Sequence, residues 1–140
     1  MVKLRLRRKG RIHHAVYDIV AVDGRARRDG AFLEKIGFYD PNTNPNTIKI
    51  SDDRALYWLN NGAQATDIVN RLLSYEGVLL RKHLTIKGKS KEEIDAEVEK
   101  HKNVVSKRYE RRKKLRVQRA INKAKAEGSA KNKENAEAEA

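Results

Sequence analysis

The sequence of 140 residues contains no cysteine, which excludes a disulfide framework and a zinc site built from thiolates. It also lacks any apolar run that approaches the roughly 18 residues of a membrane span. The basic N-terminal stretch, residues 1–11, has no apolar segment of the kind that a secretory signal peptide needs. These absences predict a cytoplasmic protein that performs no thiol redox chemistry and has no membrane partner.

Acidic residues are scarce relative to basic ones. The chain has 32 lysines and arginines against 19 aspartates and glutamates, which gives a formal net charge of +13 and a pI near 10.1. The surplus lies in the first 35 residues and again after residue 80, whereas the middle of the chain is slightly acidic. A protein of this size and charge is expected to bind a polyanion, and nucleic acid is the commonest one in the cytoplasm.

The first part of the sequence has the patterns of a β-sheet. Val2, Leu4 and Leu6 alternate with basic residues, so a strand here would turn its aliphatic side chains to a core and its cations to the opposite face. The β-branched and aromatic content of three later segments predicts further strands. Those segments are Ala15–Val22, Phe32–Tyr39 and Thr47–Ile50, and we expect one more short strand at Val78–Leu80.

Two helices are predicted between these strands. Ser51 is a suitable N-cap for a helix over Asp52–Asn60, and Thr66 is suitable for a second helix that ends at Gly77. With 39% hydrophobic residues, the chain can form one modest core but not two. The expected fold class is therefore α+β, with a mixed four- to five-stranded sheet packed against two helices.

The remainder of the chain is predicted to form a basic extension. The segment Ser90–Glu93 fits a capping box, and apolar residues at helical spacing follow it. The last ten residues are only Ala, Asn, Lys and Glu, a composition typical of disorder. We therefore expect an RNA-binding domain over residues 1–82, a helical extension over 83–126 and a disordered low-complexity tail over 127–140.

The strongest candidate site is a set of basic residues from the first strand and from a loop between two Asp-Gly turn signals. Guanidinium groups bind phosphate bidentately and stay protonated, which suits a nucleic-acid backbone. Aromatic and imidazole rings nearby would stack on unpaired bases, although a strand tyrosine is as often packed in the protein. The predicted RNA-binding residues here are Lys3, Arg5, Arg7, Arg8, Lys9, Arg11, His13, His14, Tyr17, Arg25, Arg27 and Arg28.

Two other functions remain open from the residues alone. Asp18, Asp23, Asp29 and Glu34 lie among the cations and would suit a metal-dependent nuclease, although their spacing marks no metal site. A DNA-compacting protein is the second alternative, with the basic extension as its working part. The segment Gly88-Lys89-Ser90 ends like a phosphate-binding loop, but His83 stands where that motif requires glycine.

Four ordered blocks of the sequence resemble one family. They are MVKLRL at residues 1–6, DGRARRDG at 23–30, FLEKIGFYDP at 32–41 and DRALYWLNNGAQATD at 53–67. The chain resembles bacterial ribosomal protein sixteen of the small subunit over about 80 residues. It departs from the family pattern at residues 12–17 and at Ala31, and its extension lies outside the family's common core.

The resemblance implies a structural role in the ribosome and no catalytic cycle. Its expected partners are 16S rRNA, bound in the 5′ domain, and neighbouring small-subunit proteins, with no small-molecule substrate and with Mg²⁺ only as a counterion of the rRNA. The resemblance adds Lys35 to the RNA contacts and supports those of the first strand and the loop. The resemblance implies nothing about the extension; from its charge alone, we expect it to contact RNA or a neighbouring protein through Lys107, Arg108, Arg111, Arg112, Lys113, Lys114 and Arg116.

Overall fold

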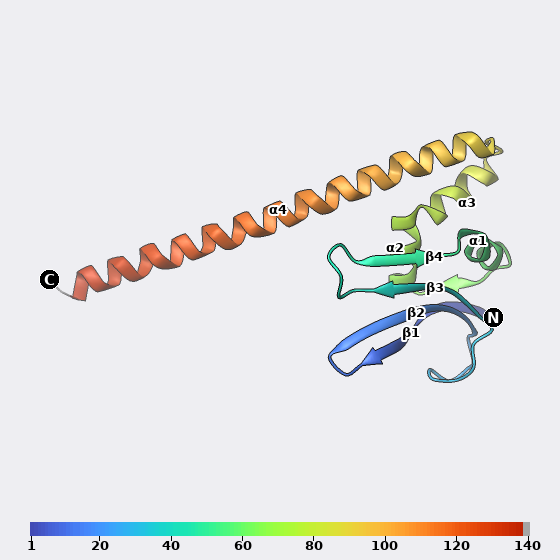
Figure 1. Cartoon of the computed structure of the whole chain (residues 1–140), viewed down its shortest axis with the longest axis horizontal. Helices are drawn as coiled ribbons and strands as arrows, with labels where there is room; N and C mark the ends of the chain where they lie inside the picture. The colour runs from blue at the N-terminus through green and yellow to red at the C-terminus, as the bar shows by residue number, and fades with distance from the viewer. Residues whose placement is uncertain (139–140) are drawn as a thin grey trace. The chain divides into compact units, whose positions relative to one another are not determined.

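The computed structural model describes the backbone of residues 1–138 and the side chains of residues 1–125 (Figure 1). Five strands form one sheet in the order β4-β3-β2-β1-β5, and every neighbouring pair is antiparallel except β1 and β5. The predicted α+β class with a mixed sheet is confirmed. The elements, in chain order, are β1 (Val2–Arg11), β2 (His14–Asp23), β3 (Glu34–Asp40), β4 (Thr47–Ile50), α1 (Asp52–Asn60), β5 (Gln64–Ala65), α2 (Asp67–Glu76), α3 (Val78–Ile86) and α4 (Lys91–Ala138).

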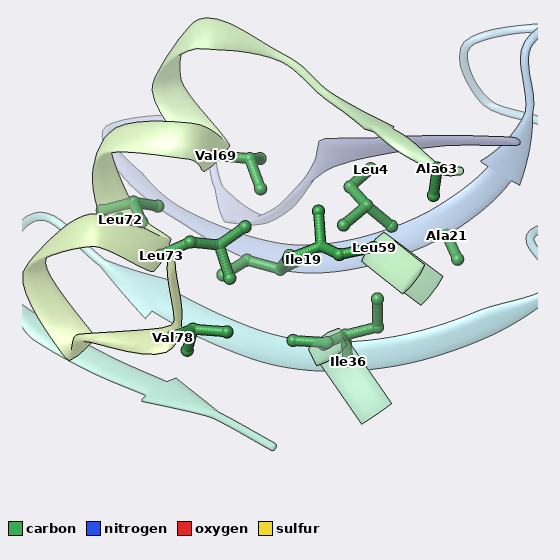
Figure 2. Close-up of a cluster of buried hydrophobic side chains, with 11 residues drawn as sticks. Leu4, Ile19, Ala21, Ile36, Leu59, Ala63, Val69, Leu72, Leu73 and Val78 are labelled. Atoms are coloured by element: carbon green, nitrogen blue, oxygen red, sulfur yellow. The ribbon is translucent and has the colours of Figure 1, made fainter. Parts of the chain in front are cut away.

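One face of the sheet packs against helices. Figure 2 shows Leu4, Ile19 and Ile36 on the sheet pointing toward Leu59 of α1 and Leu73 of α2. Leu4, Ile19 and Leu73 are completely buried. Side chains alternate between the two faces of a strand. Because Leu4 points into this core, its neighbours Lys3 and Arg5 on β1 lie on the opposite face of the sheet. The core thereby fixes which way the cations of β1 point.

The prediction of a strand at Val78–Leu80 is wrong. These residues begin α3, which follows directly after Gly77, whose φ of 83° ends α2. Val78 is completely buried in the main core, and a short apolar run of this kind does not distinguish a buried strand from a buried helix. The fifth strand is instead the two-residue segment β5, which is too short to show any periodicity.

A second, smaller cluster joins α3 to the start of α4. Leu84, Ile94 and Val98 are buried together, with Leu80 packed against them. Ser90 caps α4 as predicted, because its Oγ accepts a hydrogen bond from the backbone N–H of Glu93 at 3.4 Å. No helix in the described part of the chain is both long enough and apolar enough to cross a membrane.

The chain divides into two compact units, Met1–Lys102 and Asn103–Ala140. The first contains the sheet, α1 to α3 and the beginning of α4, and the second is the remainder of α4. The predicted division at residues 82/83 and 126/127 stays a prediction. The predicted disordered tail falls on residues 127–140, whose side chains lie outside the described part, as does the backbone of residues 139 and 140.

Candidate nucleic-acid interface

The cations of β1 lie on the face of the sheet that the helices leave uncovered. The pairing of β1 with β2 runs without a register shift from Val2 to Arg11, so the alternation holds along the whole strand. This face, which we call the basic face, carries Lys3, Arg5, Arg7, Lys9 and Arg11. Arg8 has the same parity as Leu4 and therefore lies on the helix side, opposite Tyr17 of β2. The structure thus separates Arg8 from the other predicted contacts on this strand.

The arginine loop, residues 24–33, is folded against the basic face. The Nη2 group of Arg5 donates hydrogen bonds to the backbone carbonyls of Arg27 at 2.7 Å and Arg28 at 3.1 Å. The carboxylate of Asp23 accepts a hydrogen bond from the backbone N–H of Arg25 at 3.1 Å, which forms the turn into the loop. Arg5 therefore holds the backbone of the loop, and the side chains of Arg25, Arg27 and Arg28 are exposed beside the strand.

Arg7 also makes a contact within the protein. Its guanidinium lies over the ring of Phe32, 5.0 Å from the ring centroid. Val20 and Val22 of β2 stand opposite Arg5 and Lys3 and are each only 1% exposed, so this face carries buried aliphatic side chains as well as charge. The aliphatic stems of such cations can cover apolar surface while their charged ends stay in water.

Asp18 is a buried carboxylate beneath two lysines. Its side chain is 2% exposed, and its oxygens lie 2.7 Å from Lys9 Nζ and 2.9 Å from Lys35 Nζ. Burial raises the pKa of the Asp18 carboxyl, but hydrogen bonds and the positive charges of Lys9 and Lys35 lower it by more, so its pKa lies below the ordinary value. Asp18 stays ionised at neutral pH and fixes both ammonium groups on the basic face.

The predicted contacts therefore fall into two groups. Arg5, Arg7, Lys9 and Lys35 each make a contact that orders the face. The residues of a second group are left without such a contact. Among the described residues, none of them forms an ion pair with an acidic side chain that is distant in the sequence. This second group consists of Lys3, Arg8, Arg11, Arg25, Arg27 and Arg28, of which Arg28 lies 3.3 Å from the exposed carboxylate of its neighbour Asp29, a pairing that contributes little in water.

The predicted stacking residues have different environments. His13 is exposed in the turn between β1 and β2, and His14 Nδ1 lies 3.5 Å from the side-chain nitrogen of Asn42. Tyr17 stacks on Tyr39 of β3, with ring centroids 6.2 Å apart and an interplanar angle of 28°. Tyr17 thus has a packing partner within the protein, and its stacking on a base stays a prediction.

The acidic residues considered for a nuclease do not meet. Glu34 accepts hydrogen bonds from Arg54 at 2.6 Å and from Trp58 Nε1 at 2.7 Å, so its carboxylate is bound to side chains of α1. The hydrogen bond from Arg54, and to a smaller extent that from Trp58, lowers the pKa of Glu34. In the part of the chain that the structure describes, no three histidine or acidic side chains are grouped where they could hold a metal ion.

Two features of the site were missed from the sequence, namely the buried carboxylate and the role of Arg5 in the loop. A signal for the first exists, because Asp18 is the only charged residue within the apolar segment Ala15–Val22 and a buried charge needs partners. No local signal marks Arg5, since its hydrogen bonds join residues 22 and 23 positions apart.

Comparisons of the sequence with known proteins point to one family. The family model for ribosomal protein S16 matches residues 8–66. A small ribosomal subunit protein bS16 from Azobacteroides pseudotrichonymphae is 50% identical over 132 residues, which cover 89% of this chain and 79% of that protein. The chain belongs to the ribosomal protein S16 family. The predicted resemblance is confirmed, and the chain is a structural constituent of the small ribosomal subunit, not an enzyme.

Some S16 relatives also align with the basic extension. The bS16 protein of Chlorobaculum tepidum is 46% identical over 93% of this chain and 98% of its own length. That of Chloroherpeton thalassium is 45% identical over 97% of this chain and 99% of its own length. These alignments continue far beyond residue 66, where the S16 family model ends, so the extension is shared with these relatives.

Proposed function

We propose that the chain binds 16S rRNA, in its 5′ domain, through the basic face and the arginine loop, and that it stabilises the folded RNA during assembly and translation. The supporting observation is the pair of hydrogen bonds from Arg5 to the carbonyls of Arg27 and Arg28. They join the loop cations to the strand cations in one surface. A surface of fixed cations suits RNA segments whose phosphates are brought close together by folding.

Neutralisation of phosphate is the proposed mechanism. Side chains cannot enter the deep, narrow major groove of A-form RNA, so the contacts would go to phosphates, 2′-hydroxyls and unpaired bases. Recognition would then depend on RNA shape more than on sequence. In this proposal the chain is cytoplasmic and ribosome-bound, contacts neighbouring small-subunit proteins, binds no small-molecule substrate, and Mg²⁺ serves only as a counterion of the rRNA.

A salt titration with charge-matched variants tests the proposal. The full chain is titrated with a transcript of the 16S rRNA 5′ domain at several salt concentrations, in parallel with Arg25→Gln/Arg27→Gln/Arg28→Gln. Each phosphate contact contributes about 0.7 to 0.9 to the slope of log affinity against log salt. The loop variant should therefore lose about 2 from the slope and bind roughly 100-fold more weakly at moderate salt.

The control removes three exposed cations from another part of the first unit, Lys87→Gln/Lys91→Gln/Lys100→Gln. It changes the net charge by the same amount and should keep both slope and affinity close to the original values. Equal losses in the two variants would mean that only net charge matters. Equal affinity of the original chain for duplex DNA and for the transcript would refute rRNA recognition.

A further inference from the structure

The second unit carries cations around its helix rather than on one side. Between Asn103 and Lys125 the chain has ten lysines and arginines and a single acidic residue, Glu110. The side chains of all ten are exposed. An exposed helix normally mixes both signs of charge, because opposite charges three or four residues apart stabilise it. Within this segment only Glu110 could take part in such a pair.

The cations form two stripes along the helix. Successive residues of an α-helix are rotated by about 100°, so residues three, four and seven positions apart lie on the same side. The first stripe is Lys107, Arg111, Lys114 and Lys125, and the second stripe is Arg108, Arg112, Arg116, Arg119 and Lys123. The tenth cation, Lys113, lies on neither stripe. Their mid-lines are separated by about 130° around the helix axis. A single surface in contact with one stripe would leave most of the other facing away.

The same segment has no continuous apolar face for a protein partner. Its exposed large aliphatic residues are Val104, Leu115, Val117 and Ile121. Val104 and Leu115 lie on one side of the helix, and Val117 and Ile121 lie on another side about 130° away, so each side has only two of them. A protein groove or a second helix needs a continuous apolar stripe, and a second copy of this segment would be repelled by its charge. The arrangement is complementary to polyanion on more than one side.

We propose that residues 103–125 form a bridging helix that lies between two segments of small-subunit RNA, with one stripe on the phosphates of each. The proposal rests on the RNA-binding function above and extends it to a second site. Two RNA segments repel each other across a gap, and a helix with cations on both sides lowers that repulsion for both of them.

The absence of cysteine from the chain allows a direct test. Gln118→Cys and Ala120→Cys each provide one attachment point for an Fe(II)–EDTA group, at nearly the same level of the helix but about 200° apart around it. The full-length variants are reconstituted into small subunits, and hydroxyl radicals from the tethered iron cleave the nearby rRNA. The proposal expects two separate sets of cleaved nucleotides. Cleavage from only one position, the same nucleotides from both, or none would overturn it.

Charge-matched variants give an independent test. Lys107→Gln/Arg111→Gln/Lys114→Gln neutralises part of the first stripe, and Arg108→Gln/Arg112→Gln/Arg116→Gln neutralises part of the second. Glutamine has a helix propensity close to that of lysine and arginine, so circular dichroism should show unchanged helicity. Each variant should lose about 2 from the salt slope and bind a 16S rRNA transcript roughly 100-fold more weakly at moderate salt. A loss in only one variant would place the helix on a single RNA surface and overturn bridging.

The two proposals can fail separately. If neither stripe variant changes binding while the arginine-loop variant does, the bridging helix is refuted and the function of the basic face stands. If all three variants bind the transcript as the original chain does, both proposals are refuted.

Discussion

Arg5 Nη2 lies 2.7 Å from the backbone carbonyl oxygen of Arg27, a residue 22 positions later in the chain. The hydrogen bond connects the middle of β1 to the arginine loop, and the carbonyl of Arg28 accepts a second one from the same nitrogen. A cation that was expected to contact RNA is therefore used to position other cations. Some cations of this surface therefore order it, and the others are left to bind RNA.

Arg5→Lys is expected to weaken RNA binding although it keeps the charge. A lysine ammonium does not reproduce the planar, rigid set of donors that reaches both carbonyls, so the loop should become mobile. We expect about a 10-fold loss of affinity for the 5′-domain transcript and faster cleavage by trypsin after the loop arginines. Arg11→Lys is the control, and it should have little effect on either measurement. Identical binding of the two variants would show that Arg5 has no positioning role.

Asp18 should make the stability of the domain sensitive to acid. The pKa of Asp18 in the folded state lies below its ordinary value. Its ion pairs therefore stabilise the fold fully when the pH is above the pKa of the same carboxyl in the unfolded chain, about 4. This stabilisation is lost as the pH falls from there through the folded-state pKa. Asp18→Asn should lower the free energy of unfolding at pH 6 by about 1 to 3 kcal/mol, and by less at pH 3. Urea denaturation at both values measures this difference.

The exposed Asp29→Asn serves as the control for Asp18 and should leave the free energy of unfolding unchanged at either pH. If Asp18→Asn lost as much stability on acidification as the original chain, the acid sensitivity would come from other carboxyl groups.

The sheet was largely predictable because its strands carry the signal in adjacent residues. Leu4 and Leu6 alternate with cations, and this alternation alone gave both the core side and the basic face. Ser51 stands at the N-cap of α1 as expected, although its side chain makes no capping hydrogen bond there. Arg8 is the exception on this strand, because it lies on the helix side of the sheet. The prediction named all the nearby cations without assigning each one to a face.

The other features depend on contacts between distant residues. β5 exists because Leu4 and its neighbours offer backbone groups to Gln64 and Ala65, and two residues carry no pattern of their own. Val78 is buried by the core against which α3 packs, so its short apolar run gave the wrong element. The pairing of Asp18 with Lys9 and Lys35 likewise joins three strand positions that only the folded sheet brings together.

Two glycines allow the effects of backbone strain and of steric clash to be separated. Gly10 and Gly62 have φ values of 85° and 80°, which are unfavourable for alanine. A Cβ at Gly10 would lie 2.3 Å from the backbone oxygen of His14, whereas at Gly62 it would meet nothing within 4 Å. Gly62→Ala should cost about 1 to 2 kcal/mol of stability. Gly10→Ala should cost clearly more and distort the end of the β1–β2 hairpin, as thermal denaturation would show.

Shortening the chain at two positions tests where its folded unit ends. A chain that stops at Lys102 keeps Ile94 and Val98, whose side chains are buried with Leu84 of α3, and it should melt as cooperatively as the full chain. A chain that stops at Lys89 loses both and exposes Leu84. Burial of one such side chain contributes about 1.5 to 3 kcal/mol, so this shorter chain should lose at least about 3 kcal/mol. Equal melting temperatures for the two shortened chains would mean that the start of α4 contributes nothing to the fold.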